Sequence, residues 1–166
     1  MQSGETILTL GSLALLTLFS VSINQQMSKN RSAMYQSAEV VEAIGLAQRV
    51  IEQAEMLEFD EDATATIPSS FTSGYNLGAE NGEYYINDSF DDIDDYNGFT
   101  NTAYIMQQIP CNISVDVSYA TPDNITSSST YFKKMTVSVT SPGFAETVPQ
   151  PIVLTRTFAY HYFFNE

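Results

Sequence analysis

The sequence predicts an α+β protein in which one long N-terminal helix, over about residues 3–57, packs on a small antiparallel β-sheet. Three observations lead to this prediction. A helical pattern runs from the start of the chain, and the first proline is Pro68. After Phe59 the chain becomes rich in acidic, glycine, serine and asparagine residues, which indicates irregular connections. Three later segments alternate between apolar and polar residues with the period of a strand.

The first part of the predicted helix can cross a membrane. The eighteen residues of the segment 6–23 carry no charge. A helix of that length is about 27 Å long, which is close to the hydrocarbon thickness of a bilayer. Small residues such as Gly11, Ser12 and Ala14 interrupt the large apolar ones, and small residues let helices approach one another closely. The segment therefore predicts a membrane helix that packs on other helices.

The second part of the helix is amphipathic. Apolar residues recur there at spacings of three and four, which places them on one face. We expect this stripe to cover one face of the sheet. Its members are Val40, Ile44, Ala47, Ile51, Ala54 and Leu57.

The sheet is predicted from the segments 113–119, 131–140 and 152–163, with a further short strand at 84–87. The connections between the three longer segments are long enough for antiparallel pairing. Arg156 interrupts the apolar face of the last segment without an evident reason. The side chains expected to face the helix are Ile113, Val115, Val117, Tyr119, Met135, Val137, Val139, Ile152, Leu154, Phe158, Tyr160 and Tyr162.

Charge and motif content exclude several functional classes. The chain has 20 acidic and 6 basic residues, and nucleic acid recruits lysine and arginine, so we expect no nucleic-acid partner. There is no glycine-rich phosphate loop, no Gly-x-Ser-x-Gly motif and no paired-histidine metal motif, and His161 is the only histidine. We therefore expect no enzymatic activity. Cys111 is the only cysteine, and we expect it to be a small buried apolar residue.

Glu5 is the residue on which the functional prediction depends. A carboxylate next to an apolar membrane segment is costly, so it usually faces a partner, and the nearest candidate is a free α-amino group. The chain here resembles the type IV pilins and pseudopilins, whose mature subunits begin with an apolar residue, carry glutamate at the fifth position and continue as a long half-apolar helix. The matching positions are Met1, Glu5 and residues 6–57, about a third of the chain.

This resemblance implies a pilin-like αβ roll and a role in assembly for Met1 and Glu5. In that family a prepilin peptidase removes a basic leader, the new N-terminus is methylated, and the glutamate pairs with the terminal amine of a neighbouring subunit. Lys29 and Arg31 follow the apolar segment, and no basic residue precedes it. By the positive-inside rule this distribution alone would place the head in the cytoplasm. Removal of a basic leader would resolve the conflict with an extracytoplasmic head.

The resemblance also implies the organisation and location of the chain. Residues 1–28 would form the transmembrane and filament-core half of the helix, and residues 29–166 an extracytoplasmic head that includes the amphipathic half. The subunit would lie in the inner membrane before assembly, meet the pilus assembly machinery, and then form a helical homo-oligomer at the cell surface. A structural subunit, the major pilin, is the first hypothesis. The alternatives are a minor pilin or type II secretion pseudopilin, and a membrane-anchored Ca²⁺-dependent binding module.

Acidic residues crowd into the segment 88–97. We interpret this run mainly as a solvated acidic loop, and a Ca²⁺ site is the alternative, because calcium prefers several oxygen ligands on a flexible loop. The spacing is not that of an EF-hand. The candidate calcium ligands are Asp91, Asp92, Asp94, Asp95 and Asn97.

Three asparagines stand in Asn-x-Ser/Thr triplets, which are potential glycosylation sites. They are Asn87, Asn112 and Asn124.

Overall fold

The computed structural model describes residues 2–61, 71–74, 76–80, 83, 89–105, 109–122, 124–142, 144 and 150–160. It contains a long helix α1 (Gln2–Ala54), a short 3₁₀ helix η3 (Asp94–Tyr96) and one five-stranded sheet. The chain divides into two compact units, Met1–Ala38 and Glu39–Glu166. The predicted α+β fold, with a long helix and an antiparallel sheet, is confirmed.

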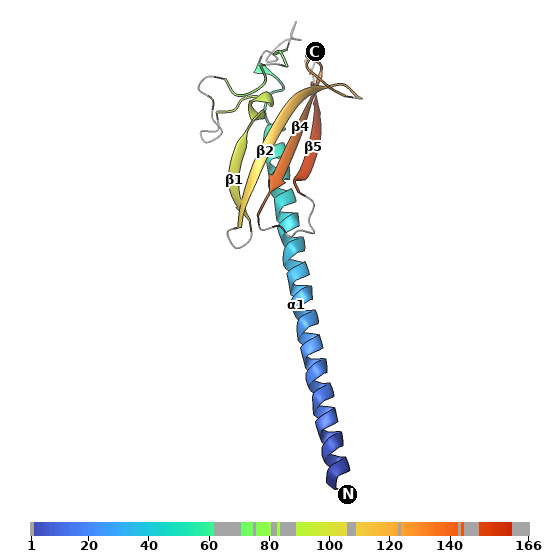
Figure 1. The fold of residues 1–166 in the computed structure, drawn as a ribbon. Coiled ribbons are helices and arrows are strands. Elements are labelled where there is room, and N and C mark those ends of the chain that lie inside the picture. The colour runs from blue at the N-terminus through green and yellow to red at the C-terminus, as the bar shows by residue number, and fades with distance from the viewer. Residues whose placement is uncertain are drawn as a thin grey trace, which may run out of the picture. The chain divides into compact units, whose positions relative to one another are not determined.

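The sheet has the strand order β1-β2-β4-β5 (Figure 1). The two-residue strand β3 also pairs with β2. All the pairings are antiparallel, as the lengths of the connections predicted. The strands are β1 (Thr100–Ile105), β2 (Ile109–Ala120), β3 (Ile125–Thr126), β4 (Phe132–Thr140) and β5 (Ile152–Ala159).

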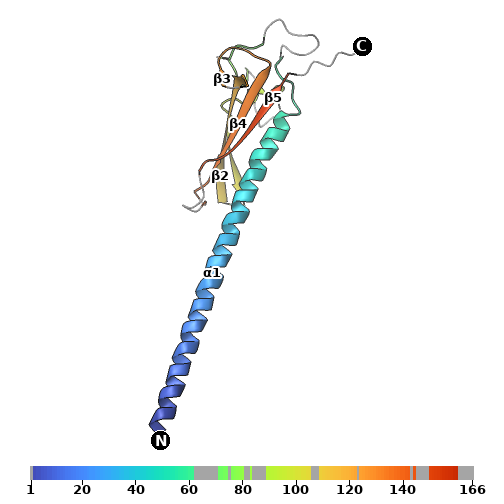
Figure 2. The same ribbon diagram turned by 90° about the vertical axis from the view of Figure 1, so that its right-hand side faces the viewer.

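The core of the second unit lies between the sheet and the part of α1 that begins at Glu39 (Figure 2). The predicted apolar faces of β2 and β4 are confirmed, because Val117, Tyr119 and Met135 are at most 2% exposed. Their polar neighbours point the other way, and Ser114 and Asp116 are exposed. Cys111 is fully buried in the same core, as predicted.

The buried face of α1 is rotated from the predicted stripe. Ala43 and Val50 are buried together with three predicted members, Ala47, Ile51 and Ala54. Ile44, which was expected on this face, is 37% exposed. Successive residues of a helix are about 100° apart, so the burial of Ala43 turns Ile44 toward the edge of the contact.

Strands β1 and β3 were not predicted from the sequence. In β1, Thr100, Asn101 and Thr102 are all exposed, so this edge strand has no apolar alternation by which to recognise it. Strand β3 is too short to show a period. The predicted strand at 84–87 lies outside the described residues.

Arg156 has a structural reason for interrupting the apolar face of β5. Its guanidinium Nη2 lies 2.8 Å from Oε1 of Glu55, just after the end of α1. Strand β5 is at the edge of the sheet, and both side chains are about half exposed. Arg156 therefore forms a surface ion pair between the last strand and the end of the helix.

Candidate functional site

The apolar part of α1 has no protein around it within the first unit. Its large side chains from Ile7 to Phe19 are about two-thirds to three-quarters exposed, for example Leu8 at 74%. The helix is long and apolar enough to cross a membrane. Soluble proteins rarely expose so large a continuous apolar surface, so this part of the helix is a candidate surface for lipid or for other helices.

Four hydroxyl groups in and next to this apolar surface, those of Thr6, Thr9, Ser12 and Thr17, donate to carbonyl oxygens of the helix itself. Thr9 Oγ1 donates to the carbonyl oxygen of Thr6, and Ser12 Oγ donates to that of Thr9, each at 2.9 Å. Thr6 donates to Ser3 and Thr17 donates to Leu13 in the same way. Such bonds remove the cost of placing a hydroxyl in lipid. The polar residues of the segment are therefore compatible with a membrane.

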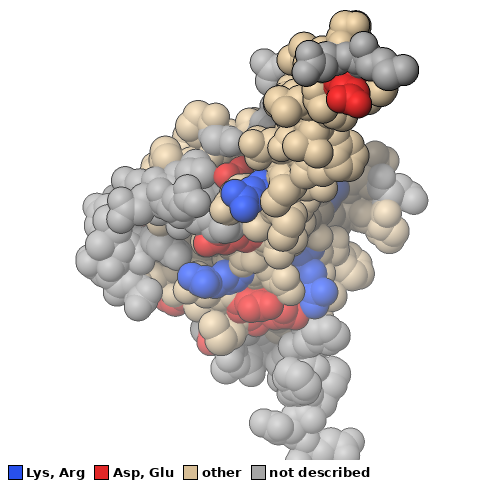
Figure 3. Space-filling view, turned by 90° about the horizontal axis from the view of Figure 1, so that it is seen from below, with Lys and Arg blue, Asp and Glu red and all other residues tan. Residues whose placement is uncertain are grey.

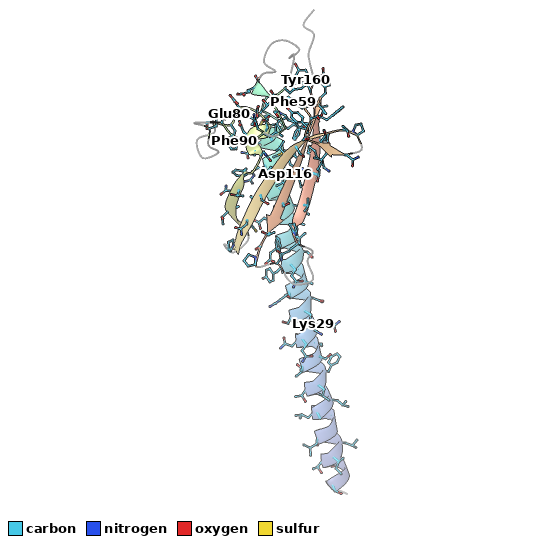
Figure 4. All side chains as sticks on the ribbon, turned by 45° about the horizontal axis from the view of Figure 1, so that its top comes forward. Lys29, Phe59, Glu80, Phe90, Asp116 and Tyr160 are labelled. Atoms are coloured by element: carbon cyan, nitrogen blue, oxygen red, sulfur yellow. The ribbon has the colours of Figure 1, made fainter. Side chains whose placement is uncertain are left out.

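Glu5 lies in the first turn of α1 and is exposed, next to the start of this apolar surface. A carboxylate is favourable in the first turn of a helix because it faces the positive end of the helix dipole. Met1, the other residue predicted to act in assembly, lies outside the described residues. Further along the helix, Lys29 is exposed, as the all-side-chain view shows (Figure 4).

The acidic run is a packed structure in the second unit. Asp92, Asp94 and Asp95 are at most 3% exposed, so their interpretation as a solvated loop is wrong. Asp91 alone of the acidic residues predicted as calcium ligands is exposed. The reason for the burial is tertiary: the backbone of Glu58, just after α1, exchanges hydrogen bonds with Asp91 and Ile93.

A buried lysine compensates part of this negative charge. Lys133 of β4 is fully buried, and its ammonium group binds the carboxylates of Asp60 and Asp94. It also donates to the carbonyl oxygen of Phe59. Tyr119 donates from its hydroxyl to Asp60 Oδ2 at 3.0 Å. The network joins the chain after α1, the acidic run and two central strands.

Asp92 is held by backbone groups. Its Oδ1 accepts the N–H groups of Asp94 and Asp95, and its Oδ2 accepts the N–H group of Glu61 at 2.9 Å. The pKa of Asp92 is raised to about 8, mainly by burial and then by the neighbouring Asp94 carboxylate, while Lys133 opposes the shift. Its bonds are internal to the fold, which identifies it as a structural residue.

Asn97 is also committed to the fold. Its side-chain Nδ2 donates to the carbonyl oxygen of Leu77, and its Oδ1 accepts the N–H group of Val117, each at 3.0 Å. Asn97 therefore connects the irregular segment before the acidic run to strand β2.

Asp95 is the member of the predicted set that groups with carboxylates from outside the acidic run. One carboxylate oxygen from each of Glu80, Glu83 and Asp95 lies within 4.8 Å of the other two. Within the part of the chain that the structure describes, no other group of three or more possible metal ligands is this close. Although Glu80 is exposed, partial desolvation raises its pKa to about 7, with contributions from a hydrogen bond to Glu83 and from nearby carboxylates. Sequence analysis missed Glu80 and Glu83 because they precede the acidic run.

No family model, curated protein or solved structure matches this chain.

Basic and acidic side chains are mixed on the surface of the protein. Lys and Arg side chains lie among acidic ones on the face shown in Figure 3. Two of the predicted glycosylation sites, Asn112 and Asn124, are exposed, and Asn112 accepts a hydrogen bond from Thr102. Asn87 lies outside the described residues. Burial raises the pKa of the Cys111 thiol, which makes this cysteine a poor nucleophile.

Proposed function

We propose that the chain is a structural subunit, the major pilin, of an extracellular type IV pilus-like filament. The observation that carries this proposal is the exposed apolar surface of α1 between Ile7 and Ile23, with Glu5 immediately before it. In the filament, these helices would bundle into the core and replace the lipid that surrounds each subunit before assembly. The heads would then cover the outside.

Three features of the helix support assembly over simple anchoring. Its small residues, such as Gly11, Ser12 and Ala14, let neighbouring helices approach closely. Because the hydroxyl groups donate to carbonyl oxygens of the same helix, the surface can contact either lipid or another helix. Glu5 would be an uncompensated charge in a lone anchor, whereas in a bundle it can meet the terminal amine of a neighbouring copy.

The heads are suited to the outside of such a filament. The second unit has its own core between the sheet and the residues of α1 from Glu39 onward. A net charge of −14 keeps a surface of this kind soluble. We propose that the subunit resides in the inner membrane and is extracellular once assembled.

Filaments sheared from cells and purified provide the direct test. We expect this chain to be the main component, and its intact mass to show a methylated amine at Met1. A chain that carries a longer or formylated N-terminus would contradict pilin processing. Presence of the chain at trace level in filaments made of another protein would instead indicate a minor pilin or a pseudopilin.

A density map of the same filaments tests the arrangement. We expect the segments of α1 before Ala38 to form the central bundle, with Glu5 next to the N-terminus of another subunit. A purified chain that remains monomeric in lipid, with no filaments in the sheared fraction, would indicate a plain membrane anchor.

A further inference from the structure

Three carboxylates converge at one side of the head, and no ion pair of theirs with a lysine or arginine is present among the described residues. They come from Glu80, Glu83 and Asp95, and an oxygen of each lies within 4.8 Å of an oxygen of the others. The ion pairs of Lys133 and Arg156 in the described part of the chain are with Asp60, Asp94 and Glu55. A third carboxylate in such a group would repel the other two unless a cation or a proton lies between them.

The buried carboxylate of this group has an unused oxygen. Asp95 is 2% exposed, and its Oδ2 accepts the N–H groups of Asp91 and Asp92. Its Oδ1 is buried and has no hydrogen-bond partner among the residues that the structure describes. A buried oxygen without a partner is costly and is rare in native proteins. Backbone hydrogen bonds therefore hold Oδ2 of Asp95 in place, and Oδ1 can accept a ligand.

The segment that carries Glu80 is also fixed relative to Asp95. Asn97, two residues after Asp95, donates to the carbonyl oxygen of Leu77. Gly78 has a φ of +132°, and a Cβ there would lie 3.3 Å from the carbonyl oxygen of Asn97. Glycine thus permits the close approach of the two segments, and Glu80 is brought toward η3 without needing an ion to do so.

We propose that Glu80, Glu83 and Asp95 bind one Ca²⁺ ion. The donors are all carboxylate oxygens, which select hard cations. Calcium accepts six to eight oxygen ligands in a flexible arrangement, whereas Mg²⁺ requires near-ideal octahedral geometry, so an irregular group of three carboxylates favours calcium. Because Glu80 is exposed and Glu83 is partly exposed, water has access to complete the coordination.

This site differs from the calcium site predicted from the sequence. Asp92, Asp94 and Asn97 are occupied by Lys133 or by backbone groups, and Asp95 alone is shared. The proposal does not depend on filament assembly, because all three ligands belong to one subunit. A bound ion would link the segment that ends at Glu83 to η3.

Calorimetric titration of CaCl₂ into the full chain, purified in detergent and stripped with EDTA, tests the site. We expect one ion per chain with a Kd of about 10⁻⁴–10⁻³ M, in the range of extracellular calcium modules. The double variant Glu80→Gln/Glu83→Gln should weaken binding by about tenfold or more, since affinity follows the number of charged ligands. Both residues have side chains that reach solvent, so the variant should remain folded.

Asp116→Asn is the matched control. Asp116 is an exposed carboxylate on the solvent face of β2, away from Glu80 (Figure 4), and its removal should leave calcium binding unchanged. Calcium should also raise the Tm of the parent and of this control, but not that of the double variant. Absence of both heat and a Tm shift in the parent at about 10 mM Ca²⁺, or equal binding by the double variant, would overturn the proposal. Equal affinity for MgCl₂ would overturn the choice of calcium.

Discussion

The ammonium group of Lys133 lies 3.2 Å from Oδ2 of Asp60, and neither side chain is exposed to solvent. The two residues are 73 positions apart in the sequence, so their contact fixes the end of the helix region against strand β4. Phe59, beside Asp60, also places its ring 4.7 Å from the same ammonium group. The charged contact and the aromatic contact therefore hold the same junction.

Removal of Lys133 should strongly destabilise the head. Lys133→Met leaves Asp60 and Asp94 buried without their cation, which typically costs about 3–5 kcal/mol. We expect the Tm of the full chain in detergent, followed by circular dichroism, to fall by on the order of 10 °C. Lys134→Met is the control, because Lys134 points to the other face of β4. Similar melting of the two variants would contradict a role for the buried network.

The surface ion pair of the edge strand should contribute much less. Arg156 and Glu55 are each about half exposed, and such pairs are worth about 0–1 kcal/mol. We expect Arg156→Met to change the free energy of unfolding by less than about 1 kcal/mol in the same melting experiment. A loss as large as that of Lys133→Met would show that the pair is an essential connection.

The stability of the head should depend on pH through Asp92. Its pKa is raised from 3.8 to about 8, so the folded state binds a proton that the unfolded state releases near pH 4. Stability from this group is therefore complete below about pH 4 and is lost as the pH rises through 8. We expect a lower Tm at pH 8.5 than at pH 6, measured in EDTA to exclude bound cations.

The same experiment on Asp92→Asn identifies the group. Asp94, Asp95 and Lys133 also act on Asp92, so the parent curve alone does not assign the effect. Asparagine does not titrate, and the variant should show a flatter dependence of Tm on pH between 6 and 8.5. Its absolute Tm is not the criterion, because the NH₂ group that replaces one carboxylate oxygen cannot accept a backbone N–H group, and both oxygens of Asp92 do so. An unchanged slope would assign the dependence to other groups.

Substitution of Glu5 should weaken assembly without affecting the head. Glu5→Gln removes the charge that we propose to pair with a neighbouring amine. A loss of a few kcal/mol per subunit should reduce sheared filaments by about tenfold or more. Glu52→Gln is the control, because Glu52 is an exposed glutamate in the same helix. Equal filament yields from the Glu5 variant and the parent would refute the proposed assembly contact.

The sequence was sufficient to predict the elements with strong periodicity. The helix pattern predicted α1 to within a few residues at each end, and alternation predicted β2, β4 and β5 together with the inward direction of Val117 and Met135. These patterns are local, because burial on one face repeats along the segment itself. Strand β1 failed the same test because its exposed threonine and asparagine residues do not alternate with apolar ones.

The acidic run could not be interpreted correctly from local pattern. Clustered aspartates usually indicate solvent exposure, and the sequence does not show that Lys133 lies opposite them in the fold. One signal was present: Lys133 is two residues before Met135, on the face of β4 that points inward. A charged residue at an inward position needs a buried partner of opposite charge. The acidic run before β1 contained candidate partners. Glu80 and Glu83 gave no such signal.

The internal bonding of Thr9, Ser12 and Thr17 has a consequence for how neighbouring helices find their axial register. Hydroxyl groups that already donate to carbonyl oxygens of the same helix form no hydrogen bonds that would favour one axial offset between neighbouring helices over another. In a filament assembled as we propose, adjacent subunits could slide past each other at low cost until the charge of Glu5 reaches its counterpart. The pairing of Glu5 would then set the axial rise per subunit, and the rest of the helix surface would allow several axial offsets.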